Sequence, residues 1–595
     1  MTVRVYLIVW AAGTALVCAV IYAQCRLVLG PLPDAASSRW AYAALEAARH
    51  ALPTPTAPQS ALRYRAAGPV FVSVYASGER RARHVGFGTL AEIIQAAAAS
   101  FGRDAQLRNL PAWRTGAAGA IHFRVAVTRA SGPLVSLPGL QVLSLVPLRD
   151  GLGAELAGRN AYLTPDDLLA QGASDRAVAA PVPDLTFGTD MAALQRTLAA
   201  ELDSSSAELQ RSGRLMRLRI DALTEPLAGQ QVNRATLLGA ARDGVAFVLR
   251  HQESSGRFTY VYDAQHDAAI EAGVYSLARH SGTIFFLARA ARELALPAAR
   301  VAALRAIDFL RETALASCGA PEHSCILQNE RVEIGAVALT ALACAELLRG
   351  GDDAAVRTLL QGLLGFLRAQ QRPDGELMHE YDRELGRPID VQHMYYSGES
   401  ALALLSGYEQ LRDRRDLEAA SRLMGHLTGA GWNFFGARYY YGEEHWTCQA
   451  VAKAAAYMPV DSALDFCLRW GQWQEHLQYH AGQTPWNVAG AFGVGPVLLP
   501  RVTTAASRVE ALVPIYRVAK AGGHDVRGIR TLVESSLGLL LRMRWAPGPA
   551  HLFARPLAAV GGIPSTAADL RSRVDMVQHA GSAMLAWADV LATGP

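Results

Sequence analysis

The carboxyl-terminal two-thirds of the chain repeats one pattern, a plain amphipathic helix followed by a helix that is apolar on most faces. The amphipathic helices are expected at residues 236–251, 298–315, 354–371, 417–431, 463–477 and 526–545. The apolar helices are expected to begin near Tyr275, Val332, Tyr395, Glu443, Ala506 and Val577. A helix that is apolar on all sides must be buried, whereas an amphipathic helix covers a core. Two alternating sets, with a period of about 50–70 residues, therefore predict a closed ring of helical hairpins whose inner wall is the apolar set.

Two turns that follow amphipathic helices support this ring. The sequences QESSGRF at 252–258 and QRPDGEL at 371–377 place Ser or Asp and then Gly where a tight turn leaves a helix end. Both are similar to the Gln-x-x-Asp-Gly-x-aromatic turns of (α/α)6 toroids. Residues 229–595 thus resemble the toroid of the six-hairpin glycosidase and terpenoid-cyclase-like superfamilies. These turns are architectural, so the resemblance implies a fold and not a reaction.

Residues 65–228 have a different pattern. Strands are expected at 70–75, 121–127 and 215–223, with helices at 90–100 and 191–210, which is typical of an α+β domain. The order of these pieces resembles the AMMECR1-like domain, most closely in DGLGAELAGRNAYLTP at 150–165. That family usually has a cysteine in its glycine-bounded motif, where this chain has Val85 and Phe87, so no thiol chemistry is carried over. We expect this domain to be a scaffold or specificity module.

The amino-terminus carries a membrane signal. Val5 to Ala23 is an uncharged, mostly apolar run between Arg4 and Arg26, and its length is about right for one bilayer crossing. A cleaved signal peptide is the competing interpretation, although the following residues lack a clean small-x-small site. We expect residues 1–25 to be a single-pass anchor, with the bulk of the chain periplasmic or extracellular. Residues 26–64, with a short helical pattern at 38–52 and prolines at 53–58, are expected to be a stalk.

The predicted fold class is therefore a multidomain protein with an N-terminal transmembrane helix, a small α+β domain and a C-terminal all-α (α/α)6 toroid. The formal net charge is +4 and there is no dense Lys/Arg run, so nucleic acid is not an expected partner. Cys318 and Cys325 flank a short loop that could close as a disulfide. Their spacing with His323 matches no standard zinc site. Cys344 and Cys467 lie in apolar helical runs and are expected to be buried packing residues.

Polar side chains gather where the apolar helices begin. In a toroid these helix starts meet at one mouth, where free N–H groups and positive dipole ends suit hydroxyl-rich or anionic ligands. The predicted substrate-binding residues are Tyr275, Arg279, His280, Tyr395, Tyr396, Trp446, Arg508, Arg573, Gln578 and His579. Aromatic rings stack on sugar faces and charged groups bind sugar hydroxyls or carboxylates. The sequence therefore predicts a carbohydrate as the partner of this mouth.

Glycoside hydrolysis is the favoured reaction, with a polysaccharide as substrate. It needs two carboxylates across the pocket, one as acid and one as base or nucleophile. Glu399 with Glu444 or Asp575 could supply them.

Three alternatives stay open. Uronate lyase or epimerase chemistry needs a base, which His393, His445 or Tyr396 could be, and an arginine, Arg279 or Arg573, for the substrate carboxylate. Metal chemistry would recruit His280, His393, His445 and His579, but their long spacings match no metal motif, so neither a metal nor a cofactor is expected. The last alternative is an envelope protein that binds glycan or peptide without catalysis.

Overall fold

The structure is a computed structural model. It describes residues 13, 15, 16, 19, 27–115, 121–134, 141, 145–178, 186–223, 231–270, 273, 275–429, 444–484, 487–493, 499–545 and 550–593.

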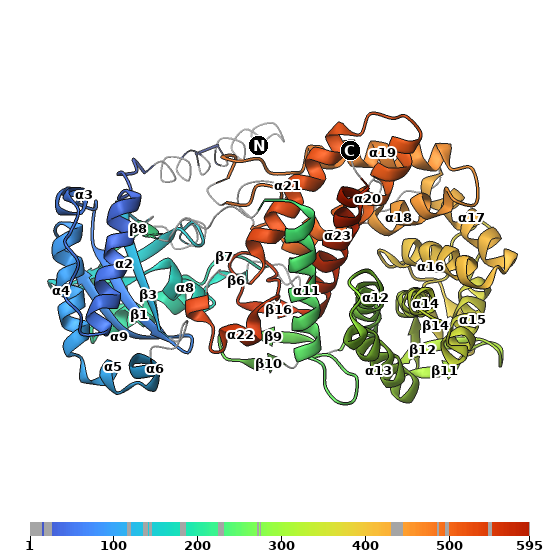
Figure 1. Cartoon of the computed structure of the whole chain (residues 1–595), viewed down its shortest axis with the longest axis horizontal. Helices are drawn as coiled ribbons and strands as arrows, with labels where there is room; N and C mark the ends of the chain where they lie inside the picture. Colours follow the sequence, from blue (N-terminus) through green and yellow to red (C-terminus); the bar gives the residue numbers. More distant parts are fainter. Residues whose placement is uncertain are drawn as a thin grey trace, which may run out of the picture.

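Twelve helices after residue 231 form two concentric layers (Figure 1). The outer helices are α11 (Arg234–Arg250), α13 (Pro297–Thr313), α15 (Ala354–Ala369), α17 (Arg414–Thr428), α19 (Asp461–Glu475) and α21 (Arg527–Met543). The inner helices are α12 (Leu277–Glu293), α14 (Ile334–Arg349), α16 (Tyr396–Leu411), α18 (Glu444–Ala454), α20 (Val502–Ala521) and α23 (Val574–Ala592). Each inner helix packs on the next, and α23 packs on α12, so the ring is closed. The predicted (α/α)6 toroid is confirmed.

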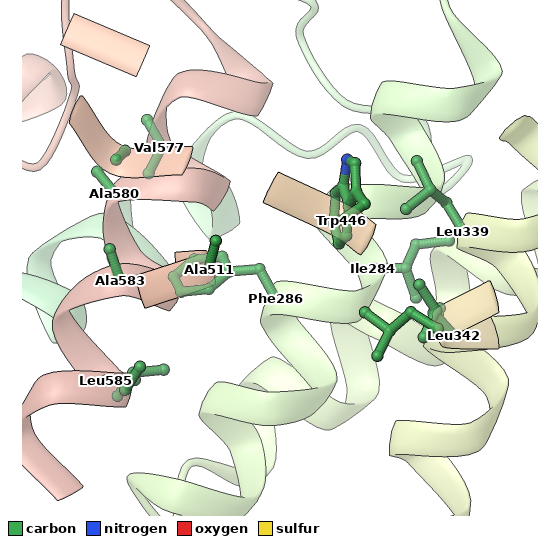
Figure 2. Close-up of a cluster of buried hydrophobic side chains, with 14 of the residues drawn as sticks. Ile284, Phe286, Leu339, Leu342, Trp446, Ala511, Val577, Ala580, Ala583 and Leu585 are labelled. Carbon is green, nitrogen blue, oxygen red and sulfur yellow. The ribbon is translucent and has the colours of Figure 1, made fainter. Parts of the chain in front are cut away.

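Burial explains why the two sets differ in sequence. In α14 every residue from Ile334 to Leu348 is buried, as an inner helix surrounded by neighbours requires. Figure 2 shows how inner helices contribute side chains to this core, with Ile284 and Phe286 from α12, Leu339 and Leu342 from α14, Trp446 from α18, Ala511 from α20, and Val577, Ala580, Ala583 and Leu585 from α23. Two inner helices begin earlier than predicted, α20 at Val502 and α23 at Val574.

A recurring glycine lets the turn after an outer helix approach the next outer helix. Gly256, Gly375 and Gly490 have φ of +93°, +93° and +94°, a conformation that strains residues with a side chain. A Cβ on these glycines would lie 2.2, 2.6 and 2.1 Å from backbone oxygens of Arg305, Arg422 and Ser535, in α13, α17 and α21. The preceding Gln252, Gln371 and Gln478 each donate from Nε2 to a carbonyl of the same helix.

Gly561 makes the equivalent contact that closes the ring. Its φ is +91°, and a Cβ there would lie 2.0 Å from the carbonyl oxygen of Asp243 in α11. Figure 1 shows green α11 beside dark red α23, and these two helices pack closely. The last hairpin is thereby joined to the first.

Short strands tie the inner-helix starts to the loops in front of them. Residues before α14 and after α15 form a sheet of β11 (Leu315–Ser317), β12 (Ser324–Gln328), β13 (Arg331–Glu333), β14 (Glu380–Asp382) and β15 (Arg387–Ile389). A second sheet consists of β9 (Val261–Asp263), β10 (Ala268–Ile270) and β16 (Arg571–Arg573). η1 (Ala550–Leu552) and α22 (Pro556–Ala559) precede β16.

The amino-terminal part is built on one antiparallel sheet of order β2-β1-β3-β8-β4-β5. Its strands are β1 (Val70–Ala76), β2 (Glu79–Gly86), β3 (His122–Pro133), β4 (Asp150–Leu156), β5 (Arg159–Leu163) and β8 (Arg214–Leu223). A small hairpin adds β6 (Ser174–Val178) and β7 (Thr186–Thr189). The helices are α2 (Ala35–Arg49), α3 (Gln59–Arg63), α4 (Leu90–Arg103), α5 (Ala105–Asn109), α6 (Pro111–Thr115), α8 (Pro165–Ala170), α9 (Met191–Glu201) and α10 (Ser206–Ser212). The mixture of sheet and helix agrees with the expected α+β class, and the AMMECR1-like resemblance stays a prediction.

Two expectations for this part were wrong. Residues 26–64 are not a bare stalk, because α2 buries Trp40, Ala41 and Leu45 in the same apolar cluster as α4 and β1. The single helix expected at 191–210 is two helices. Asp203 between them has φ of +50°, which interrupts a helix, and Ser205 caps the second one through the amide of Glu208.

The sheet and the toroid share a core. Tyr75 and Leu169 belong to the large apolar cluster of the toroid, and the ring of Tyr75 packs edge-on against His551 at 4.9 Å. Asp166 lies between Arg124 and His551, with Arg124 Nε at 2.8 Å and His551 Nε2 at 3.3 Å. The amino-terminal sheet is thus fixed to the segment that leads into β16 and α23.

The cysteines that the structure describes form two disulfides. Cys318 pairs with Cys325, as the sequence predicted, and Cys344 is free and buried. The prediction that Cys467 only fills the core was wrong, because it pairs with Cys448 and so joins α19 to α18.

The expected membrane anchor cannot be compared with the structure. Residues 1–25 lie outside the described residues except for residues 13, 15, 16 and 19. Within the part that is described, no helix combines the length and the apolar character that a bilayer crossing needs.

Candidate active site

All six inner helices begin at the wall of one cavity of about 610 Å³. This volume lies within the range of pockets that enclose small molecules. Predicted site residues that line it are Arg279, His393, Tyr395, Tyr396, Glu399, His445, Trp446, Arg508, Arg573, Asp575, Gln578 and His579. They lie far apart in sequence and are brought together because each belongs to the first two turns of an inner helix or to the segment just before it.

Tyr275 and His280 do not line this cavity. His280 is fully buried, and its Nδ1 lies 2.7 Å from the hydroxyl of Tyr275 while its Nε2 lies 3.0 Å from the carbonyl oxygen of Ala306. The hydroxyl of Tyr275 also accepts from the amide of Phe258 at 3.1 Å. Burial lowers the pKa of His280 to about 4. The structure therefore does not bring these two predicted substrate-binding residues to the cavity wall, and both are hydrogen-bonded to each other and to backbone groups.

Glu444 is the first residue of α18, and its side chain lies outside the described part of the chain. Its predicted catalytic role stays a prediction.

Two histidines from different helices meet at the cavity. The rings of His445 on α18 and His579 on α23 are 5.9 Å apart between centroids. Nδ1 of His579 lies 2.6 Å from Oε2 of buried Glu510 on α20. Burial alone would lower the pKa of His579, but the charge and hydrogen bond of Glu510, with the charge of Asp575, raise it above the usual value of 6.5. This hydrogen bond orients the imidazole ring of His579. Because Nδ1 is engaged with Glu510, Nε2 is the ring nitrogen that remains to take up or release a proton.

Asp575 holds two arginines. Its carboxylate accepts from Arg573 Nε at 2.6 Å and Nη2 at 2.9 Å, and Arg279 Nε lies 3.3 Å away. Arg279 also donates to the hydroxyl of Tyr260 at 2.5 Å. Burial by itself would raise the pKa of Asp575, but the two guanidinium charges lower it below its usual value. Asp575 is therefore an ionised anchor for cationic groups and a poor proton donor, contrary to one of the roles considered for it.

The opposite wall is acidic. Tyr396 donates a hydrogen bond to Glu333, and the buried Glu399 lies one helical turn along α16 from Tyr395. Burial and the hydrogen bond to Glu333 raise the pKa of Tyr396, so this hydroxyl keeps its proton at neutral pH and is a poor base. Nε2 of His393 lies 2.6 Å from Oε1 of Glu380.

Sequence reasoning missed several residues of the wall. Arg501, Thr503, Thr504 and Ser507 belong to the start of α20, which the prediction placed four residues too late at Ala506. The polar run after Pro500 was the available signal. Arg508 was predicted, and it is buried, with Nε donating to Gln474 and Nη1 donating to the carbonyl of Thr504 at 3.1 Å.

One group of side chains among the described residues has the composition of a metal site. Ligand atoms of His445, Glu510 and His579 all lie within 4.8 Å of one another. Two ligands of one tetrahedral zinc ion are about 3.3 Å apart, since each lies about 2.0–2.2 Å from the ion. The separation of 2.6 Å between Glu510 and His579 is shorter and is that of a charge-assisted hydrogen bond. The present arrangement favours a proton-carrying pair over a set of metal ligands.

Comparisons with known proteins give no family by sequence, because no family model and no curated protein matches this chain. Similar solved structures include a D-mannose isomerase (12% identity, TM-score 0.47, 60% of this chain and 98% of that one). Others are the cellobiose 2-epimerase of Bacillus thermoamylovorans B4167 (13%, 0.45, 60% and 100%) and a family 76 glycoside hydrolase from a bovine Bacteroides thetaiotaomicron strain (9%, 0.45, 80% and 96%). Identities and scores this low carry no argument about the reaction of this chain.

Proposed function

We propose that this chain is a carbohydrate-active enzyme that moves a proton at the carbon next to a sugar carbonyl, and so acts as an epimerase or isomerase of a small sugar. The observation that carries this proposal is the meeting of His445 and His579 at the cavity, with Glu510 hydrogen-bonded to His579. The proposal rests on this geometry and not on the similar structures.

The pair can perform both halves of such a reaction. One neutral histidine takes the proton from the carbon, the electron pair moves onto the carbonyl oxygen, and the resulting enediolate is reprotonated by the other histidine in its charged form. Return to the same carbon from the other face gives the epimer, and protonation of the neighbouring carbon gives the isomer. Arg279 and Arg573 on the adjacent wall provide positive potential for the oxygen that gains charge.

Hydrolysis is the second candidate, and Glu399 and Glu333 favour it. Both carboxylates line the cavity, as a pair of acid and base requires. Asp575 could serve only as the base or nucleophile of such a pair, because two arginines hold it ionised. A volume of about 610 Å³ also suits a short sugar better than an internal stretch of a polysaccharide.

We propose that the enzyme acts outside the cytoplasm and is held at the membrane by residues 1–25. The two disulfides support this, since such bonds persist in oxidising compartments. The apolar run from Val5 to Ala23 is of the length that an anchor needs.

Exchange with heavy water tests the reaction. A soluble form beginning near Pro31 would be incubated in deuterium oxide with a panel of reducing mono- and disaccharides that carry neutral, amino and uronate groups. We expect deuterium at the carbon next to the carbonyl in at least one sugar, measured by NMR. His445→Asn and His579→Asn should each slow this exchange by about 10²–10⁴-fold.

Two results would overturn the proposal. Chain shortening that Glu399→Gln abolishes and His579→Asn preserves would make the protein a hydrolase. No reaction with any of the sugars, although one of them binds, would make it a non-catalytic binding protein.

A further inference from the structure

A buried chain of hydrogen bonds lies behind one wall of the cavity. Glu376, in the turn after α15, accepts from the hydroxyl of Ser397 at 2.6 Å and from the amide of Leu377 at 2.8 Å. Its other oxygen lies 3.2 Å from Nε2 of His426 on α17. Ser397 lies 2.7 Å from Nε2 of His379, and Nδ1 of His379 accepts from the amide of His393 at 2.8 Å.

The donors and acceptors of this chain can be assigned in only one direction. The amide of His393 must donate, so Nδ1 of His379 has no proton and Nε2 carries it. Nε2 then donates to the oxygen of Ser397, whose own proton goes to Glu376. Oε1 of Glu376 therefore accepts, both from Ser397 and from the amide of Leu377. Burial alone would raise its pKa, but the donors around it, His379, His426 and Ser397, lower its pKa well below the usual range.

This series of hydrogen bonds holds both ends of a strained turn at residues 393–397. His393 precedes Tyr395 and Ser397 follows it, and Tyr395 has φ of +78°, which is uncommon for a residue with a side chain. Tyr395 is also the N-cap of α16 and makes no side-chain cap. Residues 393–396 all line the cavity. The two fixed ends act together with the contacts of His393 with Glu380 and of Tyr396 with Glu333 to hold this backbone conformation against an ordinary extended one.

We propose that Glu376 is a positioning residue: through Ser397 and His379 it holds the turn at residues 393–397 in the shape that forms one wall of the active site. The repeat of the toroid makes the assignment specific to this hairpin. The equivalent position in the first hairpin, directly after Gly256, is Arg257, whose guanidinium lies over the ring of Tyr275 at 4.7 Å. The position after the turn glycine thus has different roles in two hairpins. Arg257 packs on Tyr275 in the first hairpin, whereas Glu376 supports a wall of the cavity.

Hydrogen–deuterium exchange of the full-length protein tests this without any substrate. Ser397→Ala removes the hydroxyl that links His379 to Glu376, and so interrupts the series of hydrogen bonds. Glu376→Ala removes the carboxylate that accepts from Ser397. Both should speed amide exchange in peptides spanning residues 388–400 by about tenfold or more, while peptides from α14 and α23 keep their protection. Glu376→Gln should change it by less than about threefold, since its amide oxygen can accept from Ser397 and its amide nitrogen can donate to His426. Glu253→Gln, an exposed residue of the first repeat turn, is the matched control.

Unchanged exchange at 388–400 in Ser397→Ala, or an equal rise throughout the toroid, would overturn the inference. A second arm rests on the proposed function: once a sugar that reacts is known, Ser397→Ala should lower kcat about tenfold with little change in KM, and Glu376→Gln should restore most of the kcat that Glu376→Ala loses. Faster exchange with unchanged kcat would also overturn it. If exchange behaves as expected and the wild type turns over no sugar, the proposed function fails and the positioning role stands.

Discussion

A carboxylate behind a histidine decides which ring nitrogen is left to react. Nδ1 of His579 is 2.6 Å from Glu510, so the proton between them belongs to that nitrogen and Nε2 is unprotonated in the neutral ring. The same contact raises the pKa of His579, because burial, which opposes the charged form, is outweighed by the charge of Glu510. One residue thus sets both the tautomer and the pH range in which His579 is a base.

Glu510→Gln should move the acid limb of the pH profile. The rate rises as His579 loses its proton, so in the wild type kcat/KM increases through a pKa above 6.5. Loss of the negative charge lowers that pKa, and the limb should shift to lower pH. At neutral pH kcat should fall by about tenfold to hundredfold, because an amide holds the required tautomer less firmly. An unshifted limb, with Glu534→Gln on the outer helix α21 as control, would show that His579 is not the base.

At this scale the sequence predicted where site residues gather but not what each of them does. Polar side chains at inner-helix starts were a sufficient signal for Arg279, His445 and His579. The same signal also selected Tyr275 and His280, which hydrogen-bond to each other and to the backbone. Some side chains at a helix start face away from the cavity, and only the packing of the helix shows which ones. The hydrogen bond between Glu376 and Ser397 could not be predicted from the sequence, since it joins the turn after α15 to the start of α16, and only the folded structure brings the two together.

Among the elements, the turns that join hairpins are defined by contacts of glycine with helix backbone. Gly561→Ala should destabilise the protein by about 2 kcal/mol more than Gly482→Ala. Both substitutions put alanine in the left-handed region, which costs about 1–2 kcal/mol. Gly482 has φ of +82° and open space around it, whereas a Cβ at Gly561 would meet the oxygen of Asp243 at 2.0 Å. Urea unfolding measures the difference in the free energy of unfolding. Equal destabilisation in the two variants would show that the backbone around Gly561 and Asp243 shifts at little cost to accept a Cβ.

The disulfide between Cys448 and Cys467 stabilises the helix that carries His445. It closes a loop of 19 residues, for which chain entropy gives about 3 kcal/mol. The double change Cys448→Ala and Cys467→Ala should lower the free energy of unfolding by about this amount. The reduced wild type should match the variant in the same measurement. A variant as stable as the oxidised protein would mean that packing alone holds α18 to α19.

Long periodic helices were predictable, and short strands were not. The outer helices lie within a few residues of the ranges that periodicity predicted, because each buries one continuous stripe. Strands of three residues, such as β14 and β16, have no period to detect, and they form only because the hairpins bring them together. The packing of α2 against the sheet was missed because a proline-rich segment follows it.

For the whole molecule, Asp166 links the amino-terminal part to the toroid, because it pairs with Arg124 of β3 and lies 3.3 Å from Nε2 of His551. Asp166→Ala should cost about 3–5 kcal/mol, because Arg124 loses its carboxylate partner in a largely buried site and His551 loses its neighbour. Asp465→Ala, at an exposed pair with Arg469, should cost less than about 1 kcal/mol. Guanidinium unfolding should show one transition in the wild type, since Tyr75 and Leu169 share the toroid's core. Two separate transitions would contradict a shared core.

The contribution of Asp166 should depend on pH with a definite sign. Burial would raise its pKa, but Arg124 and His551 lower it strongly. A carboxylate with a lowered folded-state pKa stabilises the protein fully above its unfolded value, about 3.9, and loses this effect as pH falls towards the folded value. The gap between wild type and Asp166→Ala should therefore narrow in acid.

The contact between Gly561 and Asp243 has a consequence for how the chain reaches its native state. It joins the first hairpin of the ring to the last, so nearly the whole toroid must exist before the contact can form. Folds dominated by pairings between distant parts of the chain are slow to form, because the loop entropy is lost before the contact is gained. Until that moment α11 and α12 expose an apolar flank that α23 will cover. A nascent toroid therefore passes through an open arc with an exposed apolar flank, and such an intermediate is prone to aggregate until the ring closes.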